Sequence, residues 1–372
     1  MIKYPLFKVS MPKDMHLALQ PVLESGFVSE GPKAKEFETK MQEWLGNPHT
    51  ALTNSGTSAL IIALRLADVE PGDEVLTTAQ TCVATNSAIL TVGGKVVWAD
   101  INPRTGNIDP SGLEKLITKK TKAIMCVDWS GIPCEYTEIH KVAAKYGLRV
   151  IQDAAHSNGG FYKGFKVGTI PDTLCAFSYQ AIKHFTTCDG GSVATTSKNE
   201  YERAILLRWF GLSRTHNQGL IKWDNALTEL GYKFHQNDLN ATIGLESLKI
   251  IDGVIQKHKE NGKLLRNLLS NSKYVENLDV EDYMDPSYWI CTIKLKNPEH
   301  RQKVTEGLTS VGIGCGVVHT DNSQYELFST SKVDLPGVRE FSNRQLNVPC
   351  GWWLSTEDVH YIAENVLKFA ES

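Results

Sequence analysis

The chain has 372 residues, enough for two domains or for one large domain with a smaller one. Its 42 acidic and 39 basic residues are mixed along the sequence, and the net charge of −3 excludes a basic field for nucleic acid or an anionic membrane. No stretch of about 18 apolar residues predicts a membrane span. The eight cysteines form no CxxC pair, and the start does not resemble a signal peptide. We therefore expect no metal site and a cytoplasmic protein with reduced thiols.

The first half of the chain alternates short apolar runs with helical patterns. The first 30 residues have little periodicity, and Gly26, Gly31 and Pro32 predict a turn-rich lead-in. After it, strands are predicted over 74–78, 95–101, 122–127 and 148–152, and helices over 58–69, 84–92 and 135–146. This alternation predicts an α/β fold with a mostly parallel sheet between helices, and ligands beyond the carboxyl ends of the strands.

The second half begins with a strong helix signal from residue 237 to about 269, which predicts a connector. Beyond it, a strand is predicted over 288–295, and helices are predicted over 298–311 and 357–369. We therefore expect a lead-in and large domain over residues 1–240. A connecting helix and a small C-terminal α/β domain would follow over residues 241–372.

Lys183 is the lysine whose surroundings most suggest chemistry. It follows the apolar residues Cys175–Phe177 and Ser178, and it precedes a Thr-Thr-Cys-Asp-Gly-Gly turn. An amine partly removed from water loses its proton near neutral pH and can attack a carbonyl. An aldehyde cofactor such as pyridoxal phosphate (PLP) requires such an amine. From this stretch alone, an ordinary solvated lysine explains the sequence equally well.

Two other segments carry candidate ligand-binding residues. Asn54–Leu60 opens a helix, where Gly56 permits close backbone approach and the free amides favour a phosphate. The Ser178 hydroxyl is placed to bind the same phosphate. Asp153 follows a strand, where a carboxylate can pair with a protonated pyridine nitrogen, while His156 could hold that carboxylate or approach the ring. Plain helix caps and a surface histidine are the alternatives.

Taken in order, these segments resemble the DegT/DnrJ/EryC1/StrS family of sugar aminotransferases, which belongs to the aspartate aminotransferase superfamily of fold type I. The resemblance covers nearly the whole length. Its most specific motifs are NSGTSAL, VIQDAAHSNGG, FSYQAIKHFTTCDGGSVATT, GYKFHQNDLNATIGL and LNVPCGWWLSTEDV. It implies a fold type I enzyme that depends on PLP and has a smaller C-terminal domain.

The resemblance also implies a role for each matching residue. Lys183 would bond to the cofactor aldehyde and then move the proton between cofactor and substrate, and Asp153 would pair with the pyridine nitrogen. His156 would lie near the ring oxygen. The cofactor phosphate would be held by Gly56, Thr57 and Ser178.

The chain departs from the family pattern at two positions. Lys233 stands where members often carry an asparagine that reaches the phosphate of the neighbouring subunit's cofactor, and a lysine would act there as a point charge. Cys82 stands where many members carry an aromatic residue that stacks on the ring. We expect both residues beside the cofactor of a homodimer that shares its active sites.

The resemblance predicts an enzyme that moves an amino group from L-glutamate to a nucleotide-linked keto-sugar in amino-sugar biosynthesis. The segment FSYQAIKH favours C-4 of the sugar over C-3. A sugar dehydratase is an alternative, although Lys183 argues against the branch in which histidine replaces the lysine. A non-catalytic sensor is an alternative of another class. The nucleotide, the sugar and the pathway stay open.

Overall fold

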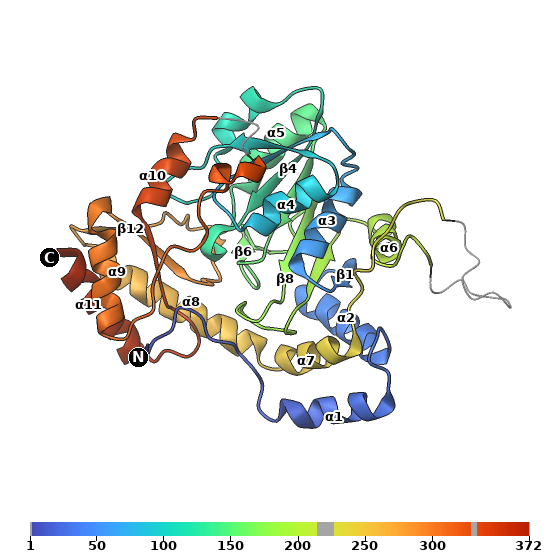
Figure 1. Ribbon diagram of the computed structural model, residues 1–372, viewed down its shortest axis with the longest axis horizontal. Helices are drawn as coiled ribbons and strands as arrows, with labels where there is room; N and C mark the ends of the chain where they lie inside the picture. Colours follow the sequence, from blue (N-terminus) through green and yellow to red (C-terminus); the bar gives the residue numbers. More distant parts are fainter. Residues whose placement is uncertain (1, 214–226, 329–332, 372) are drawn as a thin grey trace.

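A seven-stranded sheet forms the centre of the protein in this computed structural model, which describes residues 2–213, 227–328 and 333–371 (Figure 1). The strand order is β1-β9-β8-β5-β4-β2-β3. All strands of this sheet run in one direction except β9, which pairs antiparallel with β1 and β8. The strands are β1 (Thr50–Thr53), β2 (Glu74–Thr78), β3 (Lys95–Ala99), β4 (Thr121–Val127), β5 (Arg149–Asp153), β8 (Thr173–Ser178) and β9 (Gly191–Ala194). The predicted α/β class with a mostly parallel sheet is confirmed.

Helices cover both faces of this sheet because its strands are apolar on both sides. On β4, Ala123 and Met125 join the cluster around α3, whereas Ile124 and Cys126 join the cluster around α5. Successive side chains of a strand point to opposite faces, so each cluster covers one face. The helices of this part are α2 (Pro32–Leu45), α3 (Gly56–Leu66), α4 (Val83–Thr91), α5 (Tyr136–Tyr146) and α6 (Lys198–Leu207).

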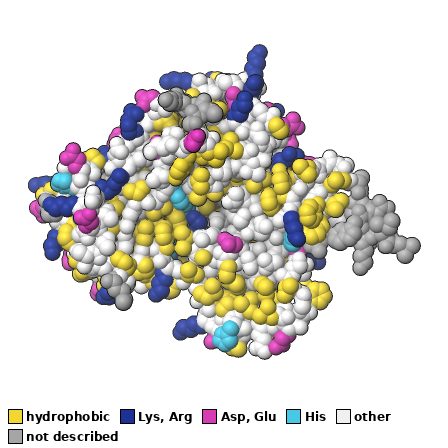
Figure 2. All heavy atoms as spheres, viewed as in Figure 1, with side chains coloured by type: hydrophobic (Ala, Val, Ile, Leu, Met, Phe, Trp, Pro, Cys, Tyr) yellow, Lys and Arg dark blue, Asp and Glu magenta, His cyan; other side chains and the backbone are white. Residues whose placement is uncertain are grey.

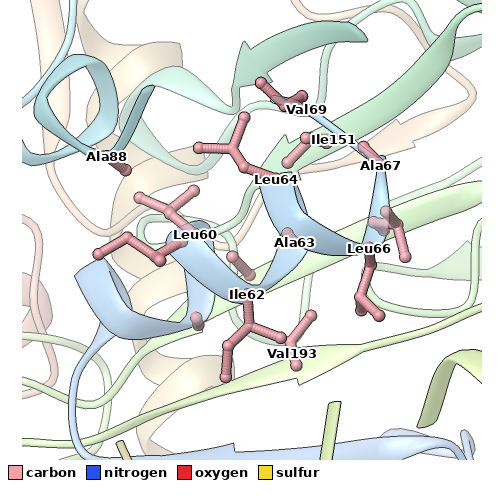
Figure 3. Close-up of a cluster of buried hydrophobic side chains, with 14 of the residues drawn as sticks. Leu60, Ile62, Ala63, Leu64, Leu66, Ala67, Val69, Ala88, Ile151 and Val193 are labelled. Atoms are coloured by element: carbon pink, nitrogen blue, oxygen red, sulfur yellow. The ribbon is translucent and has the colours of Figure 1, made fainter. Parts of the chain in front are cut away.

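Helix α3 is buried on nearly every side and fixes one wall of the site described below. Ser55 caps it, and the Ser55 hydroxyl accepts the amide hydrogen of Ser58. Figure 3 shows Leu60, Ile62 and Leu64 of this helix inside the apolar cluster that also contains Val193 of β9. Because so much apolar surface is buried along it, α3 is held firmly and its first turn has a fixed place at the sheet edge.

The N-terminal lead-in was expected to be rich in turns, but an 11-residue helix forms within it. Residues Met15–Ser25 form helix α1, which packs against α7. Only Met15 and Val22 of the helix are buried, and Pro21 lies inside it. The apolar stripe is therefore too sparse to show helical periodicity, and packing on α7 stabilises a helix that the sequence pattern does not reveal.

The long helix predicted from residue 237 to 269 is divided into α7 (Asp238–Leu248) and α8 (Ile251–Leu269). Ile250, with φ of −119°, lies at the break. Helix α7 packs on α1 and α2. Helix α8 instead packs on α11 (Thr356–Glu371) and on the C-terminal strands β10 (Val275–Asn277) and β12 (Cys291–Leu295). We attribute the break to these two directions of packing, which one straight helix does not satisfy.

The C-terminal part is built on a three-stranded antiparallel sheet, β10 (Val275–Asn277), β12 (Cys291–Leu295) and β13 (Gln345–Val348). Helices α9 (Arg301–Ser310) and α11 (Thr356–Glu371) share its apolar cluster, which also includes Tyr4 from the start of the chain. Helix α10 (Pro336–Arg344) packs on β12. The division of the chain near residue 240 stays a prediction.

The remaining elements are short. A separate small sheet contains β6 (Phe161–Tyr162), β7 (Phe165–Lys166) and β11 (Met284–Asp285). The 3-10 helices are η1 (Pro110–Leu116), η2 (Trp129–Gly131), η3 (Pro298–His300), η4 (Asn322–Gln324) and η5 (Glu326–Phe328). The predicted helix over 298–311 thus begins with η3 and continues as α9.

The surface carries one notable collection of exposed apolar side chains near α1. Leu17 and Leu23 of α1 and the following Phe27 are exposed. Figure 2 shows hydrophobic side chains gathered at the lower edge of the view, where Figure 1 places α1 and α7. Among the helices described, none combines the length and the apolar character needed to cross a membrane.

Candidate active site

A cavity of about 270 Å³ lies at the carboxyl edge of the central sheet, lined by residues that follow β1, β2, β5 and β8. Ligands of open α/β sheets bind at this edge. The structure brings together here all the predicted site residues except Lys233. These are Gly56, Thr57, Cys82, Asp153, His156, Ser178 and Lys183.

Lys183 lies on a closed loop between β8 and β9, ahead of the Thr-Thr-Cys-Asp-Gly-Gly turn. The Tyr179 amide donates to the Gly190 carbonyl at 2.8 Å, and the Thr187 amide donates to the Tyr179 carbonyl at 3.0 Å. Within the loop, the Lys183 amide donates to the Gln180 carbonyl at 2.9 Å. The backbone that carries the lysine is therefore fixed by hydrogen bonds at its base and at its tip.

The surroundings of Lys183 favour an amine that changes protonation near neutral pH. Burial lowers the pKa of Lys183 to about 8, although the negative charge of Asp153 and the neighbouring Cys82 act to raise it. The balance leaves both forms of the amine accessible close to physiological pH. A lysine with these properties can act as a nucleophile and can transfer a proton.

Asp153 ends β5 and is almost completely buried at 4% exposure. One carboxylate oxygen accepts the Thr85 hydroxyl hydrogen at 2.7 Å, and the other accepts the Ala155 amide hydrogen at 3.1 Å. Burial raises the pKa of Asp153, while these two hydrogen bonds and Lys183 oppose the rise. A carboxylate in this setting gains from a cationic partner, which a protonated pyridine nitrogen would supply.

His156 follows Asp153 by three residues but does not hold its carboxylate. The Nδ1 atom of His156 is buried and has no hydrogen-bond partner among the described residues. Burial lowers the pKa of His156 well below its usual value, and the positive charge of Lys183 adds to this effect. His156 is therefore neutral at physiological pH, and it forms part of the cavity lining.

The start of α3 and the end of β8 meet at the opposite part of the cavity lining. The first amides of a helix have no partner within the helix and favour an anion. A Cβ atom at Gly56 would lie 2.7 Å from the Ser178 Cβ and 3.2 Å from its Cα, so only glycine allows this approach. Thr57 and Ser178 also line the cavity and add hydroxyl groups. Gly56, Thr57 and Ser178 thus lie together and present amide and hydroxyl donors, and we call this group the phosphate turn.

We expect that Gly56→Ala lowers the affinity of the cofactor-free protein for PLP roughly tenfold. The added methyl group must push Ser178 and the α3 start apart, which separates the donors of the phosphate turn. Titration with PLP, followed by absorbance, measures the affinity. Gly253→Ala is the matched control, because a Cβ at this exposed position on α8 meets no atom within 4 Å. Equal affinities for both variants would contradict the assignment.

Asp128 supports the turn that carries His156 and was not identified from the sequence. It is fully buried and accepts hydrogen bonds from Ser157 at 2.7 Å, Tyr136 at 2.7 Å and Gln152 at 2.6 Å. Its amide also donates to the carbonyl of Asp153. Burial raises the pKa of Asp128, which the surrounding donors counter. The residue therefore fixes backbone next to the site.

Trp289 and His319 complete the cavity wall from the C-terminal part of the chain, and sequence reasoning missed both. Neither residue lies in a recognisable motif, and Trp289 stands in an apolar run that only predicts a strand. The His319 ring lies parallel to the His156 ring, with 5.5 Å between centroids. Burial lowers the pKa of His319 to about 4. No sequence signal distinguished these residues from core aromatic residues.

Lys233 lies outside the lining of this cavity. Its side chain is exposed, and its carbonyl accepts a hydrogen bond from the Asn54 side chain at 3.3 Å. The backbone of Lys233 therefore lies near the start of α3, although the two segments are far apart in the sequence. Its side chain does not line the cavity of the same chain. The role expected for it in a neighbouring subunit stays a prediction.

The residues of the cavity fit PLP in three respects. Lys183 supplies an amine for an aldehyde, Asp153 supplies a buried carboxylate for a pyridine nitrogen, and the α3 start with Ser178 supplies donors for a phosphate. His156 adds a neutral imidazole to the lining. This set of donors matches the functional groups of the cofactor.

Comparisons with known proteins agree with this geometry. The chain matches the DegT/DnrJ/EryC1/StrS aminotransferase family over residues 10–367. It is 30% identical over 362 residues to the UDP-4-amino-4,6-dideoxy-N-acetyl-beta-L-altrosamine transaminase of Campylobacter jejuni, which covers 95% of this chain and 94% of that protein.

Two solved structures are also similar. The sugar aminotransferase CalS13 from Micromonospora echinospora has a TM-score of 0.92 and 32% identity, covering 99% of this chain and 100% of that one. The PLP-form of Spr1654 from Streptococcus pneumoniae has a TM-score of 0.90 and 27% identity, covering 99% and 98%.

Proposed function

Because the chain belongs to the DegT/DnrJ/EryC1/StrS aminotransferase family, we propose that this aminotransferase moves an amino group from L-glutamate to a nucleotide-linked keto-sugar. The cavity at the carboxyl edge of the sheet carries this proposal, since Lys183, Asp153 and the phosphate turn line one space. The product would be an amino-deoxy sugar for glycan or natural-product biosynthesis. PLP, when bound, supplies an electron sink that stabilises negative charge at the carbon being deprotonated.

The side chains of the cavity divide the work. Lys183 would hold the cofactor through its amine, and the same amine, when free, would carry the proton between two carbons. Asp153, held in place by Thr85 and the Ala155 amide, would pair with the pyridine nitrogen. Gly56, Thr57 and Ser178 would hold the phosphate. The buried His156 would orient the ring, and Cys82 would pack beside it.

Amination at C-4 is our preferred regiochemistry. The segment FSYQAIKH supports it. The Campylobacter jejuni relative, whose name describes a UDP-linked sugar with nitrogen at C-4, adds support. Amination at C-3 remains the alternative within the same reaction.

We further propose a homodimer in which Lys233 of one subunit reaches the cofactor phosphate of the other. The exposed Lys233 lies beside Asn54, next to the phosphate turn. Exposed apolar residues of α1 offer surface that association would bury.

All eight cysteines are unpaired, which supports a reducing, cytoplasmic setting.

A substrate panel tests the proposed reaction. Purified enzyme with PLP and glutamate receives UDP-, dTDP- and GDP-linked sugars that carry a ketone at C-4 or at C-3. We expect one 4-keto sugar to be aminated with kcat/KM at least about tenfold above its 3-keto counterpart. Product mass and NMR identify the carbon that bears nitrogen, and formation of 2-oxoglutarate identifies the donor.

Three outcomes would contradict this proposal in different ways. Faster amination of the 3-keto series would reverse the regiochemistry. A deoxygenated sugar without an amino sugar would identify a dehydratase. PLP binding without any turnover of the panel or of glutamate would favour a sensor. Lys183→Ala serves as the blank for every reaction.

A further inference from the structure

Trp289 contacts the lysine loop through both its indole nitrogen and its ring face. It lies just before β12, and its indole Nε1 donates a hydrogen bond to the Ile182 carbonyl at 2.8 Å. The Lys183 Nζ atom lies 3.8 Å from the centroid of the indole ring. The His156 ring stacks on the indole with 4.0 Å between centroids and 17° between planes. One side chain therefore joins the loop backbone, the lysine amine and His156.

The indole is held in this position by residues from the start of the chain. Phe7 stacks on it with 4.8 Å between centroids and 26° between planes. The segment that carries Phe7 is fixed by the amides of Lys3 and Tyr4, which both donate to the Gly312 carbonyl at 2.9 Å. Trp289 is only 2% exposed, so it serves neighbouring side chains and offers no free ring face to a substrate.

We propose that Trp289 is a positioning residue that holds the free amine of Lys183 over its ring face and stabilises the protonated form. This inference rests on the role of Lys183 proposed above. Whenever the Lys183 amine would not be bonded to the cofactor, its long flexible side chain would need a defined place. A cation–π contact supplies one, because the negative face of the ring attracts the ammonium.

The groups around Lys183 determine how strongly its protonated amine is favoured. Asp153 at the end of β5 and Cys82 at the start of α4 favour the protonated amine. The imidazoles of His156, His184 and His319 all have lowered pKa values because they are buried, so they are neutral at pH 7 and do not repel the ammonium. Burial disfavours the ammonium, and the indole face partly compensates for the lost water.

Fluorinated tryptophans at position 289 test the cation–π contact with almost no change in shape. Fluorine withdraws electron density from the ring and weakens its attraction for a cation. The pKa of Lys183 in the cofactor-free protein is read from the pH dependence of its reaction with trace acetic anhydride, followed by peptide mass spectrometry. We expect the pKa to fall with each added fluorine, by about one unit in total. A pKa that does not change across the series would overturn the proposal.

A pair of substitutions separates the ring face from the hydrogen bond. Trp289→Phe keeps a ring and loses the donor to Ile182, whereas Trp289→Leu loses both. We expect the leucine variant to lower the pKa of Lys183 by about one unit and the phenylalanine variant to lower it by less than half as much. Equal shifts in both variants would reduce Trp289 to a packing residue.

Trp352→Leu is the matched control, because Trp352 lies 5.5 Å from the Lys8 amine and outside the cavity lining. It should leave the pKa of Lys183 unchanged. The labelling uses neither cofactor nor sugar, so it is independent of the substrate panel. If no sugar of the panel is aminated but the pKa of Lys183 still falls with added fluorine, only the proposed reaction is rejected. Turnover of the panel with no fluorine trend rejects only the role of Trp289.

Discussion

Replacing Lys183 with alanine is expected to lower the rate of amino transfer by about 10³-fold or more. The variant would lose the amine that we propose bonds to the cofactor and moves the proton between carbons. Its absorption spectrum with PLP should resemble free PLP, since no lysine amine is available in the cavity. Stopped-flow measurement of the glutamate half-reaction gives the rate.

Chemical rescue distinguishes a lost proton carrier from a damaged fold. Small primary amines added to Lys183→Ala should restore part of the rate, with better rescue at higher amine pKa, because they enter the space that the side chain leaves. Lys166→Ala is the matched control. Burial lowers the pKa of Lys166 to about 8 as well, but its amine lies 3.6 Å from the Trp44 ring centroid, and neither residue lines the cavity.

The Lys166 control should keep its activity. Retention of activity in Lys183→Ala would overturn the assignment of the catalytic lysine. Equal losses in the two variants would show that a lowered pKa, and not the position in the cavity, explains the effect.

Asp153→Asn is expected to lower kcat on the order of 10²-fold while leaving the cofactor-free protein at least as stable at pH 7. Asparagine would remove the charge that we propose keeps the pyridine nitrogen protonated, so the bound cofactor would be a weaker electron sink. The amide can still exchange hydrogen bonds with Thr85 and the Ala155 amide. The loss of rate should therefore come from charge and not from collapse of the turn.

The expected effect on stability follows from the direction of the pKa shift of Asp153. Burial raises the pKa in the folded protein above the unfolded value. Between those two pKa values the folded state binds more protons than the unfolded state. The free energy of unfolding therefore falls as pH rises through this window, and above it the charged carboxylate costs stability. Asparagine removes that dependence, so thermal unfolding of the cofactor-free variant should change less with pH.

Asp282→Asn, at an exposed position, is the control for removing one negative charge. It should change neither kcat nor the pH dependence of unfolding. Asp153→Asn should also lower the pKa of Lys183 below about 8, because Asp153 raises it in the native protein. An unchanged kcat in Asp153→Asn would contradict its pairing with the cofactor. A lower stability of the cofactor-free variant at pH 7 would contradict the burial argument.

The sequence by itself determined the alternation of strands and helices over residues 58–152, four strands of the central sheet, and the residues of the cavity that lie in motifs. The strand over 74–78 has its predicted bounds, and helix α5 ends at Gly147 with a left-handed backbone, as the glycine suggests. These features come from local signals: apolar periodicity, caps and glycines. Asp153 could be named because it follows a predicted strand, Gly56 because it opens a predicted helix, and Lys183 because apolar residues and a serine precede it.

Tertiary structure decided everything that depends on packing between distant segments. Helix α1 forms because it packs on α7, with Met15 and Val22 buried, and the predicted connector divides because α7 and α8 pack on different partners. Trp289 and His319 enter the cavity wall only through the folding of the C-terminal part against the large sheet. An aromatic side chain in an apolar run has the same pattern whether it fills a core or faces a lysine, so only the folded chain shows that Trp289 contacts Lys183.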